Sequence, residues 1–175
     1  MAESFTNSLV GSAGIVTTSA TGVIGAGTTI ISGISTNGIA VGNQVATQFF
    51  NGGAKVLYIG TGQVSLDKTS TNTSASTAQF ASFTGVTTCY TASTKSILVG
   101  GTFANLTNNS INLTVEVGLG NTFANLASEI PVPSGSSFVI SDAGKTILRQ
   151  NEEIRVYVDA KDGVSVSLSI LDGVS

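Results

Sequence analysis

Residues 111–117 read Ile-Asn-Leu-Thr-Val-Glu-Val, and their strict alternation of apolar and polar side chains indicates the fold class. Successive side chains of an extended strand point to opposite faces, so the isoleucine, leucine and valines share one face and the polar residues share the other. This pattern is typical of a half-buried antiparallel strand. Residues 154–158 and 164–170 repeat the pattern on either side of residues 159–163, which end in Asp-Gly. We therefore predict a hairpin there.

Strand-like segments recur along the rest of the chain. Residues 96–104, 123–132 and 137–140 bring the C-terminal half to about six or seven strands, enough for an antiparallel β-sandwich or jelly roll. Residues 55–59 and 63–66 flank a Gly-Thr-Gly turn and predict a hairpin in the N-terminal half. Long stripes of apolar residues at helical spacing are missing. We expect an all-β protein.

A polar run divides the chain into two predicted regions. Residues 69–78 read TSTNTSASTA and have the composition of a linker. Before it, the charged residues sum to zero, whereas residues 79–175 hold eight acids and five bases. We predict a small Gly/Thr-rich β region over residues 1–78, suited to assembly contacts, and a β-sandwich domain over residues 79–175.

The composition indicates a chain that associates with other chains. Charged residues are 10% and hydrophobic residues 41% of the 175 residues, and the mean hydropathy is +0.36. Such a weakly charged surface favours burial against copies or partners, so we expect a homo-oligomer, with a trimer favoured. The net charge of −3 and the scattered bases argue against nucleic-acid binding.

Membrane and secretion signals are also missing from the sequence. Polar residues interrupt every apolar run well short of about 18 residues, so no membrane span is expected. The start of the chain has neither the basic residues nor the apolar block of a secretory signal, so we expect the chain to be made in a cytoplasm.

The residues of ordinary catalytic and metal sites are scarce. The chain has no histidine, and its one cysteine, Cys89, has no partner for an internal disulfide. Residues 143–146 resemble the end of a phosphate-binding loop, but Val139 replaces the first glycine of that motif. Asp159 and Asp162 flank a turn, and a weak calcium site there stays an alternative. We predict no catalytic residues, no cofactor and no metal, and therefore not an enzyme.

The adjacent residues Phe49 and Phe50 are the predicted assembly contact. Two neighbouring side chains of an extended chain point to opposite faces, so one of them is free to meet a neighbouring subunit or a second sheet layer. A strand buried on both faces is the alternative.

A short repeat, Thr-Phe-Ala-Asn-Leu, occurs at residues 102–106 and again at residues 122–126. Two copies are too few for a solenoid. We predict two strands in equivalent places of a sandwich, each burying its phenylalanine.

Two stretches that cover most of the chain resemble structural proteins of tailed bacteriophages. The N-terminal stretch is similar to Gly/Thr-rich β modules of virion proteins, and the C-terminal stretch resembles compact β-sandwich proteins of such phages, including cyanophages. The residues that carry the likeness are 30–42, 53–56 and 63–66, then 96–99, 130–137 and 151–156.

The resemblance implies a decoration or cement protein that stabilises a capsid by bridging neighbouring shell subunits. Its implied partners are the major capsid protein or other virion proteins, and its implied location is the virion, assembled in the host cytoplasm. The alternative is a neck, tail or fibre component that binds a host-surface glycan.

Overall fold

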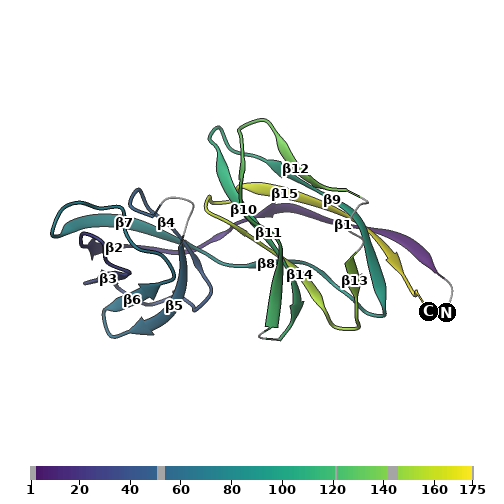
Figure 1. Cartoon of the computed structure of the whole chain (residues 1–175), viewed down its shortest axis with the longest axis horizontal. Coiled ribbons are helices and arrows are strands. Elements are labelled where there is room, and N and C mark those ends of the chain that lie inside the picture. Colours follow the sequence, from purple (N-terminus) through teal and green to yellow (C-terminus); the bar gives the residue numbers. More distant parts are fainter. Residues whose placement is uncertain (1–2, 51–53, 121, 142–145, 175) are drawn as a thin grey trace.

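The computed structural model describes residues 3–50, 54–120, 122–141 and 146–174, and these residues form an all-β protein of two lobes (Figure 1). Strands account for 62% of the structure, and the described residues contain no helix. One lobe is a closed barrel and the other is a sandwich of two antiparallel sheets. The predicted all-β class with a C-terminal sandwich is confirmed.

The sandwich packs two sheets around one apolar core. The first sheet has the order β1-β15-β9-β12, and β13 also pairs with β9; the second has the order β11-β10-β14-β8. The largest fully buried side chains come from both sheets, among them Phe103, Leu168 and Ile154. The strands are β1 (Ser4–Ala13), β8 (Thr87–Thr91), β9 (Ser96–Asn105), β10 (Ile111–Leu119), β11 (Thr122–Val132), β12 (Ser137–Ile140), β13 (Thr146–Leu148), β14 (Glu153–Val158) and β15 (Val164–Asp172).

The barrel closes around a second core that contains Phe83 and Ile31. Its strand order is β2-β3-β6-β5-β4-β7, and β7 pairs back onto β2. The predicted hairpin is confirmed as β5 and β6, with Gly62 at φ 67° in the turn, a conformation that glycine adopts without strain. The strands are β2 (Val16–Ile24), β3 (Ile30–Ser32), β4 (Gln44–Ala46), β5 (Ala54–Gly60), β6 (Gln63–Leu66) and β7 (Thr77–Thr84).

The chain path differs from the predicted division at residue 78. Strand β1 pairs with β15 in the sandwich, so the chain starts in the sandwich, builds the barrel and returns through β8. Within the supposed linker, Asn72 is buried and its Nδ2 donates to the carbonyl of Ile24 at 2.7 Å. Strand β7 then begins at Thr77, inside the same run. The polar run is therefore part of the barrel rather than a connection between two regions.

The predicted hairpin over residues 154–170 is wrong, although both of its strands exist. Strand β14 pairs with β10 and β8 in the second sheet, whereas β15 pairs with β1 and β9 in the first. Residues 159–163 therefore connect the two sheets across the core. The alternating pattern gives each strand one apolar face. It does not distinguish two strands that pair within one sheet from two strands that pack against each other in opposite sheets.

The outer face of β10 is also buried, which corrects the prediction of a half-buried strand. Thr114 and Glu116, on the polar face of the strand, are each 5% exposed. The repeated phenylalanines differ as well: Phe103 is fully buried in β9, whereas Phe123 is half-buried in β11, at the edge of the second sheet. The prediction that both phenylalanines enter the core is therefore wrong for Phe123.

Candidate functional site

The junction between the lobes holds a cluster of charged side chains. The Nζ of Lys55, on β5 of the barrel, lies 3.0 Å from Oε1 of Glu116 on β10, and Nη2 of Arg155 on β14 lies 3.3 Å from Oε2 of the same carboxylate. The Arg155 guanidinium lies 3.3 Å from the centre of the Phe123 ring. The Lys55 ammonium lies over the Tyr157 ring, 4.5 Å from the ring centre, and makes a cation–π interaction with it.

A second ion pair crosses the same junction. Lys68, just after β6, pairs with Glu129 on β11, a residue whose backbone N–H donates to Thr114 Oγ1 at 3.0 Å. Lys55 and Lys68 are the only basic residues in the first 94 positions of the sequence. Both cations of the barrel therefore face the sandwich.

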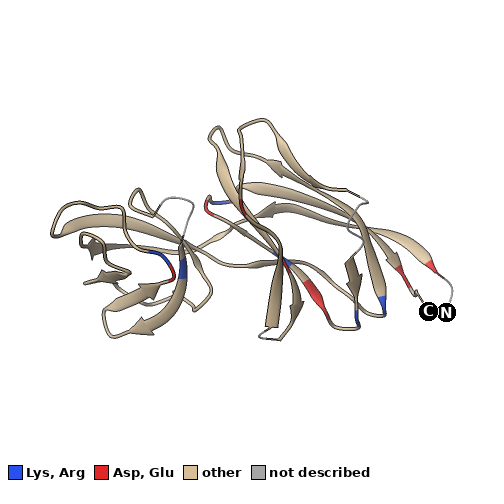
Figure 2. Ribbon diagram, viewed as in Figure 1, with Lys and Arg blue, Asp and Glu red and all other residues tan. Residues whose placement is uncertain are grey.

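The barrel is left with an outer surface that is almost uncharged. Its one acidic residue, Asp67, accepts a hydrogen bond from the backbone N–H of Lys55. Figure 2 shows the barrel in tan apart from a few coloured residues beside β5 and β6. Four large apolar side chains of the barrel are exposed by 56% to 64%, and we call this set of residues the barrel patch: Val41 before β4, Leu57 and Tyr58 on β5, and Phe80 on β7.

The first sheet of the sandwich carries a second uncharged surface on its outer side. Among the residues of its strands the only charged one is Asp172, at the end of β15. Its carboxylate accepts hydrogen bonds from the hydroxyls of Tyr90, Ser96 and Thr6, so it is engaged on the inner side of the sheet rather than on the outer face. We call the outer side of this sheet the uncharged sheet face.

The strand register arranges the uncharged sheet face in rows. Phe5 lies opposite Leu171, Leu171 opposite Ile97, and Ile97 opposite Ile147, so one apolar row crosses the whole sheet. Directly opposed residues of antiparallel strands point to the same face. The two ends of the row, Phe5 and Ile147, are 74% and 58% exposed. We call this row the ridge.

Further along the strands the same face is hollowed. Small side chains occupy the middle of the sheet there, and the hollow has a volume of about 270 Å³. Leu9 lies at one edge strand and Val139 at the other, in a row that also contains Ser167 and Thr102. Six of the residues that line the hollow are Leu9, Gly11, Thr102, Ala104, Ser165 and Ser167.

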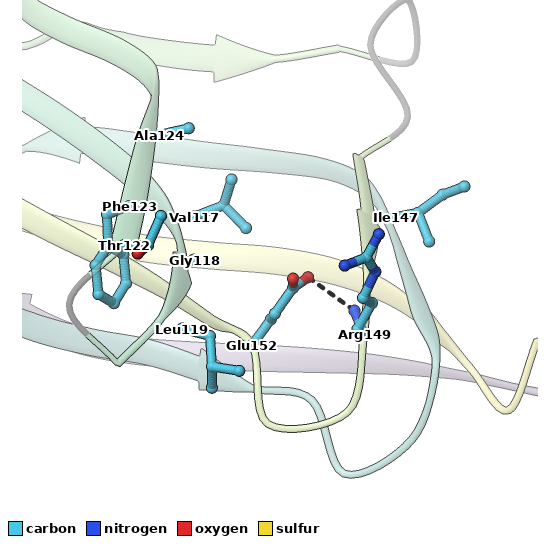
Figure 3. A pocket seen from close by; sticks show the side chains of 9 residues that line it. All are labelled: Val117, Gly118, Leu119, Thr122, Phe123, Ala124, Ile147, Arg149 and Glu152. Atoms are coloured by element: carbon cyan, nitrogen blue, oxygen red, sulfur yellow. Dashed lines mark hydrogen bonds between the residues drawn. The ribbon is translucent and has the colours of Figure 1, made fainter.

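A third feature is a pocket of about 540 Å³ beside the β10–β11 hairpin (Figure 3). Phe123, Leu119 and Ile147 supply apolar walls, and Arg149 and Glu152 supply the charged groups. The carboxylate of Glu152 accepts a hydrogen bond from the backbone N–H of Arg149 at 2.8 Å, so it closes the turn between β13 and β14. These lining residues include no paired acid and base of the kind that general acid–base catalysis requires.

The Cys89 thiol and the Asp159 carboxylate are candidate groups for nucleophilic and metal chemistry, and the structure buries the first and hydrogen-bonds the second. Burial raises the pKa of the Cys89 thiol to about 12, which keeps it protonated and unreactive at neutral pH. The carboxylate of Asp159 accepts hydrogen bonds from the backbone and side-chain nitrogens of Asn112, at 2.9 and 2.7 Å. Across the described ranges, no three His, Cys, Asp or Glu side chains are grouped to hold a metal ion. Residues 143–145 of the stretch similar to a phosphate-binding loop lie outside the described residues.

The two phenylalanines predicted as an assembly contact lie in a turn after β4, not in a strand. Phe50 is 3% exposed and belongs to the barrel core, and Phe49 is half-buried against that core. Phe50 is therefore occupied within its own chain, which corrects its expected role as an outward contact. The exposed large apolar residues include those of the barrel patch and the uncharged sheet face; four others are Ile15, Val86, Leu106 and Leu119.

Sequence reasoning indicated the uncharged N-terminal region as a contact surface but missed the junction cluster and the uncharged sheet face. One signal for the cluster was present, since Lys55 and Lys68 are the only cations in a half of the chain whose other charged residues are Glu3 and Asp67. The rows of the sheet face had no such signal, because their members come from segments far apart in the sequence.

Comparison of the chain with family models, curated proteins and solved structures gives no match. Among the described residues, no helix has the length and apolar character needed to cross a membrane. Functional inference therefore depends on the geometry and chemistry of the surfaces above.

Proposed function

We propose that this chain is a non-enzymatic structural protein of a phage virion, a decoration or cement protein that stabilises the capsid by bridging neighbouring shell subunits. The observation that carries the proposal is the barrel patch on a lobe whose two lysines both face the sandwich. Its partner is the major capsid protein or another virion protein, and its place is the virion, after assembly in the host cytoplasm.

Apolar exposure gives a physical reason for such a contact. Full burial of a large apolar side chain stabilises by about 1.5–3 kcal/mol, so each residue of the barrel patch, at 56–64% exposure, offers about 1–2 kcal/mol when a partner covers it. With so few charges on the lobe, neither long-range steering nor repulsion contributes much. Binding through the barrel patch should therefore change little between low and high salt.

The test uses particles that lack the protein. Such particles should rupture at a lower temperature than complete ones, and added protein should restore them at both low and high salt. Phe80→Lys, which places a charge in the barrel patch, should abolish the rescue. Ser128→Lys, at an exposed position of β11 in the sandwich, adds the same charge away from the patch and should rescue fully. Depleted particles as robust as complete ones would refute the cement role.

A neck, tail or fibre component that binds a host glycan is the second candidate, and one observation favours it. Tyr58 lies on β5, and its side chain is 61% exposed. An open aromatic ring is a common platform for sugar stacking. Glycan-array binding that disappears in Tyr58→Ala, with depleted particles that are robust but no longer attach to cells, would support this function over the cement role.

A further inference from the structure

We infer that the uncharged sheet face seats a second copy of this chain, packed face to face around a two-fold axis. The inference concerns the sandwich and is independent of the virion proposal, which concerns the barrel. A two-fold axis gives a dimer, in place of the trimer that composition favoured.

The face is self-complementary in shape. The ridge runs across the sheet at Phe5 and Ile147, and the hollow lies on the same face around Ser167. Phe5 and Leu9 are four residues apart on β1, and at about 3.3 Å per residue the two features lie about 13 Å apart. A two-fold axis that lies in the plane between the two faces, parallel to the ridge and midway between the ridge and the hollow, places the ridge of each copy over the hollow of the other. That geometry makes two identical contacts per dimer.

Charge supports a copy of the same chain as the occupant. A charged side chain close to a two-fold axis approaches its own equivalent, so a charge near the axis opposes association. The described strands of this face carry no charge other than Asp172, whose side chain is bonded to Tyr90 and Ser96 on the inner side of the sheet. None of the described strand residues on this face therefore places a charge against the symmetry mate.

The size of the face corresponds to the lower end of the range found for stable dimers. Four columns of strands at about 4.8 Å and about nine residues at 3.3 Å give a projected area of about 600 Å², before the relief of the side chains is added. Standard protein interfaces bury about 800 Å² on each partner. The exposed fractions of Phe5, Leu9, Val139 and Ile147, between 55% and 74%, leave most of their apolar surface available for burial.

The test is sedimentation equilibrium of the purified chain with two neutral variants of the face. Phe5→Ser with Ile147→Ser removes the two exposed ends of the ridge, and Ser167→Gln fills the hollow. Each variant spoils both contacts of its own dimer and should weaken association at least about tenfold, as expected for central apolar contacts. Leu57→Ser, in the barrel patch, removes a comparable exposed side chain and should leave association unchanged. Circular dichroism checks that every variant keeps its β structure.

Mixing the two variants gives the sharpest result. In a mixed dimer the intact ridge of one chain meets the intact hollow of the other, so an equimolar mixture should associate more tightly than either variant alone. A wild-type monomer at about 100 μM, a wild-type trimer or a mixture without rescue would each overturn the inference. Loss of association from Phe5→Ser but not from Ile147→Ser would also overturn it, because that result indicates pairing through the β1 edge alone.

Discussion

Replacing Glu116 by glutamine should destabilise the protein far more than replacing Glu129, although both carboxylates join the barrel to the sandwich. The Glu116 side chain is 6% exposed and contacts two cations, Lys55 at 3.0 Å and Arg155 at 3.3 Å. The Glu129 side chain is 41% exposed in its pair with Lys68. Glutamine keeps the shape of glutamate and removes only its charge.

The magnitude follows from burial. Removing one member of a buried ion pair typically costs about 3–5 kcal/mol, because the remaining charge loses its partner. The side chains of Lys55 and Arg155 are 30% and 20% exposed, so water can partly solvate the two charges once the carboxylate is removed. We therefore expect Glu116→Gln to lower the free energy of unfolding by about 2–3 kcal/mol, whereas an exposed pair such as that of Glu129 contributes about 0–1 kcal/mol. For a chain of this size these values correspond to losses of about 5–10 °C and about 0–3 °C in Tm.

Thermal unfolding followed by far-ultraviolet circular dichroism measures both variants. A double-mutant cycle with Lys55→Met and Glu116→Gln then isolates the contact between the lobes, and its coupling energy should exceed about 1 kcal/mol. Raising the salt concentration should reduce the small effect of Glu129→Gln and leave most of the larger one. Equal losses for the two glutamine variants, or no coupling in the cycle, would refute the conclusion that Glu116 anchors the junction.

Two further predictions test the repeat and the sheet end. In urea unfolding, Phe103→Ala should lower the free energy of unfolding by about 3–5 kcal/mol, because the ring is fully buried. Phe123→Ala should lower it by only about 1–2 kcal/mol, because Phe123 is half-buried and its ring contacts the Arg155 guanidinium. Similar losses for the two variants would contradict the different placement of the two rings. Burial raises the pKa of Asp172, but hydroxyl hydrogen bonds, that from Tyr90 foremost, lower it more, so the pKa lies below its ordinary value of 3.8. The ionised carboxylate therefore stabilises the fold above pH 3.8, and this stabilisation is lost as the pH falls through the pKa of the folded state. Between pH 6 and pH 2 the free energy of unfolding should fall more for the wild type than for Asp172→Asn. The same pH dependence in both proteins would contradict the prediction.

The sequence by itself determined the local structure. Alternation at residues 111–117 identified β10, and the Gly-Thr-Gly turn fixed the β5–β6 hairpin. Both depend on neighbours in the chain, because side-chain direction alternates along any strand and a tight turn needs a residue that accepts positive φ. The low charge also indicated surfaces suited to association, and the exposed apolar residues of the described chain are consistent with that expectation.

Only the tertiary structure decided which strands are neighbours. Ser4 pairs with Asp172 across almost the whole chain, and β14 and β15 enter different sheets although a short turn separates them. Alternation defines two faces for each strand but does not identify the element that covers either face, so Glu116 was expected at the surface and is buried under Lys55 and Arg155. The ridge and the hollow likewise exist only because the register aligns segments from both ends of the chain. Partner choice depends on packing between distant segments, and that packing is a property of the folded chain as a whole.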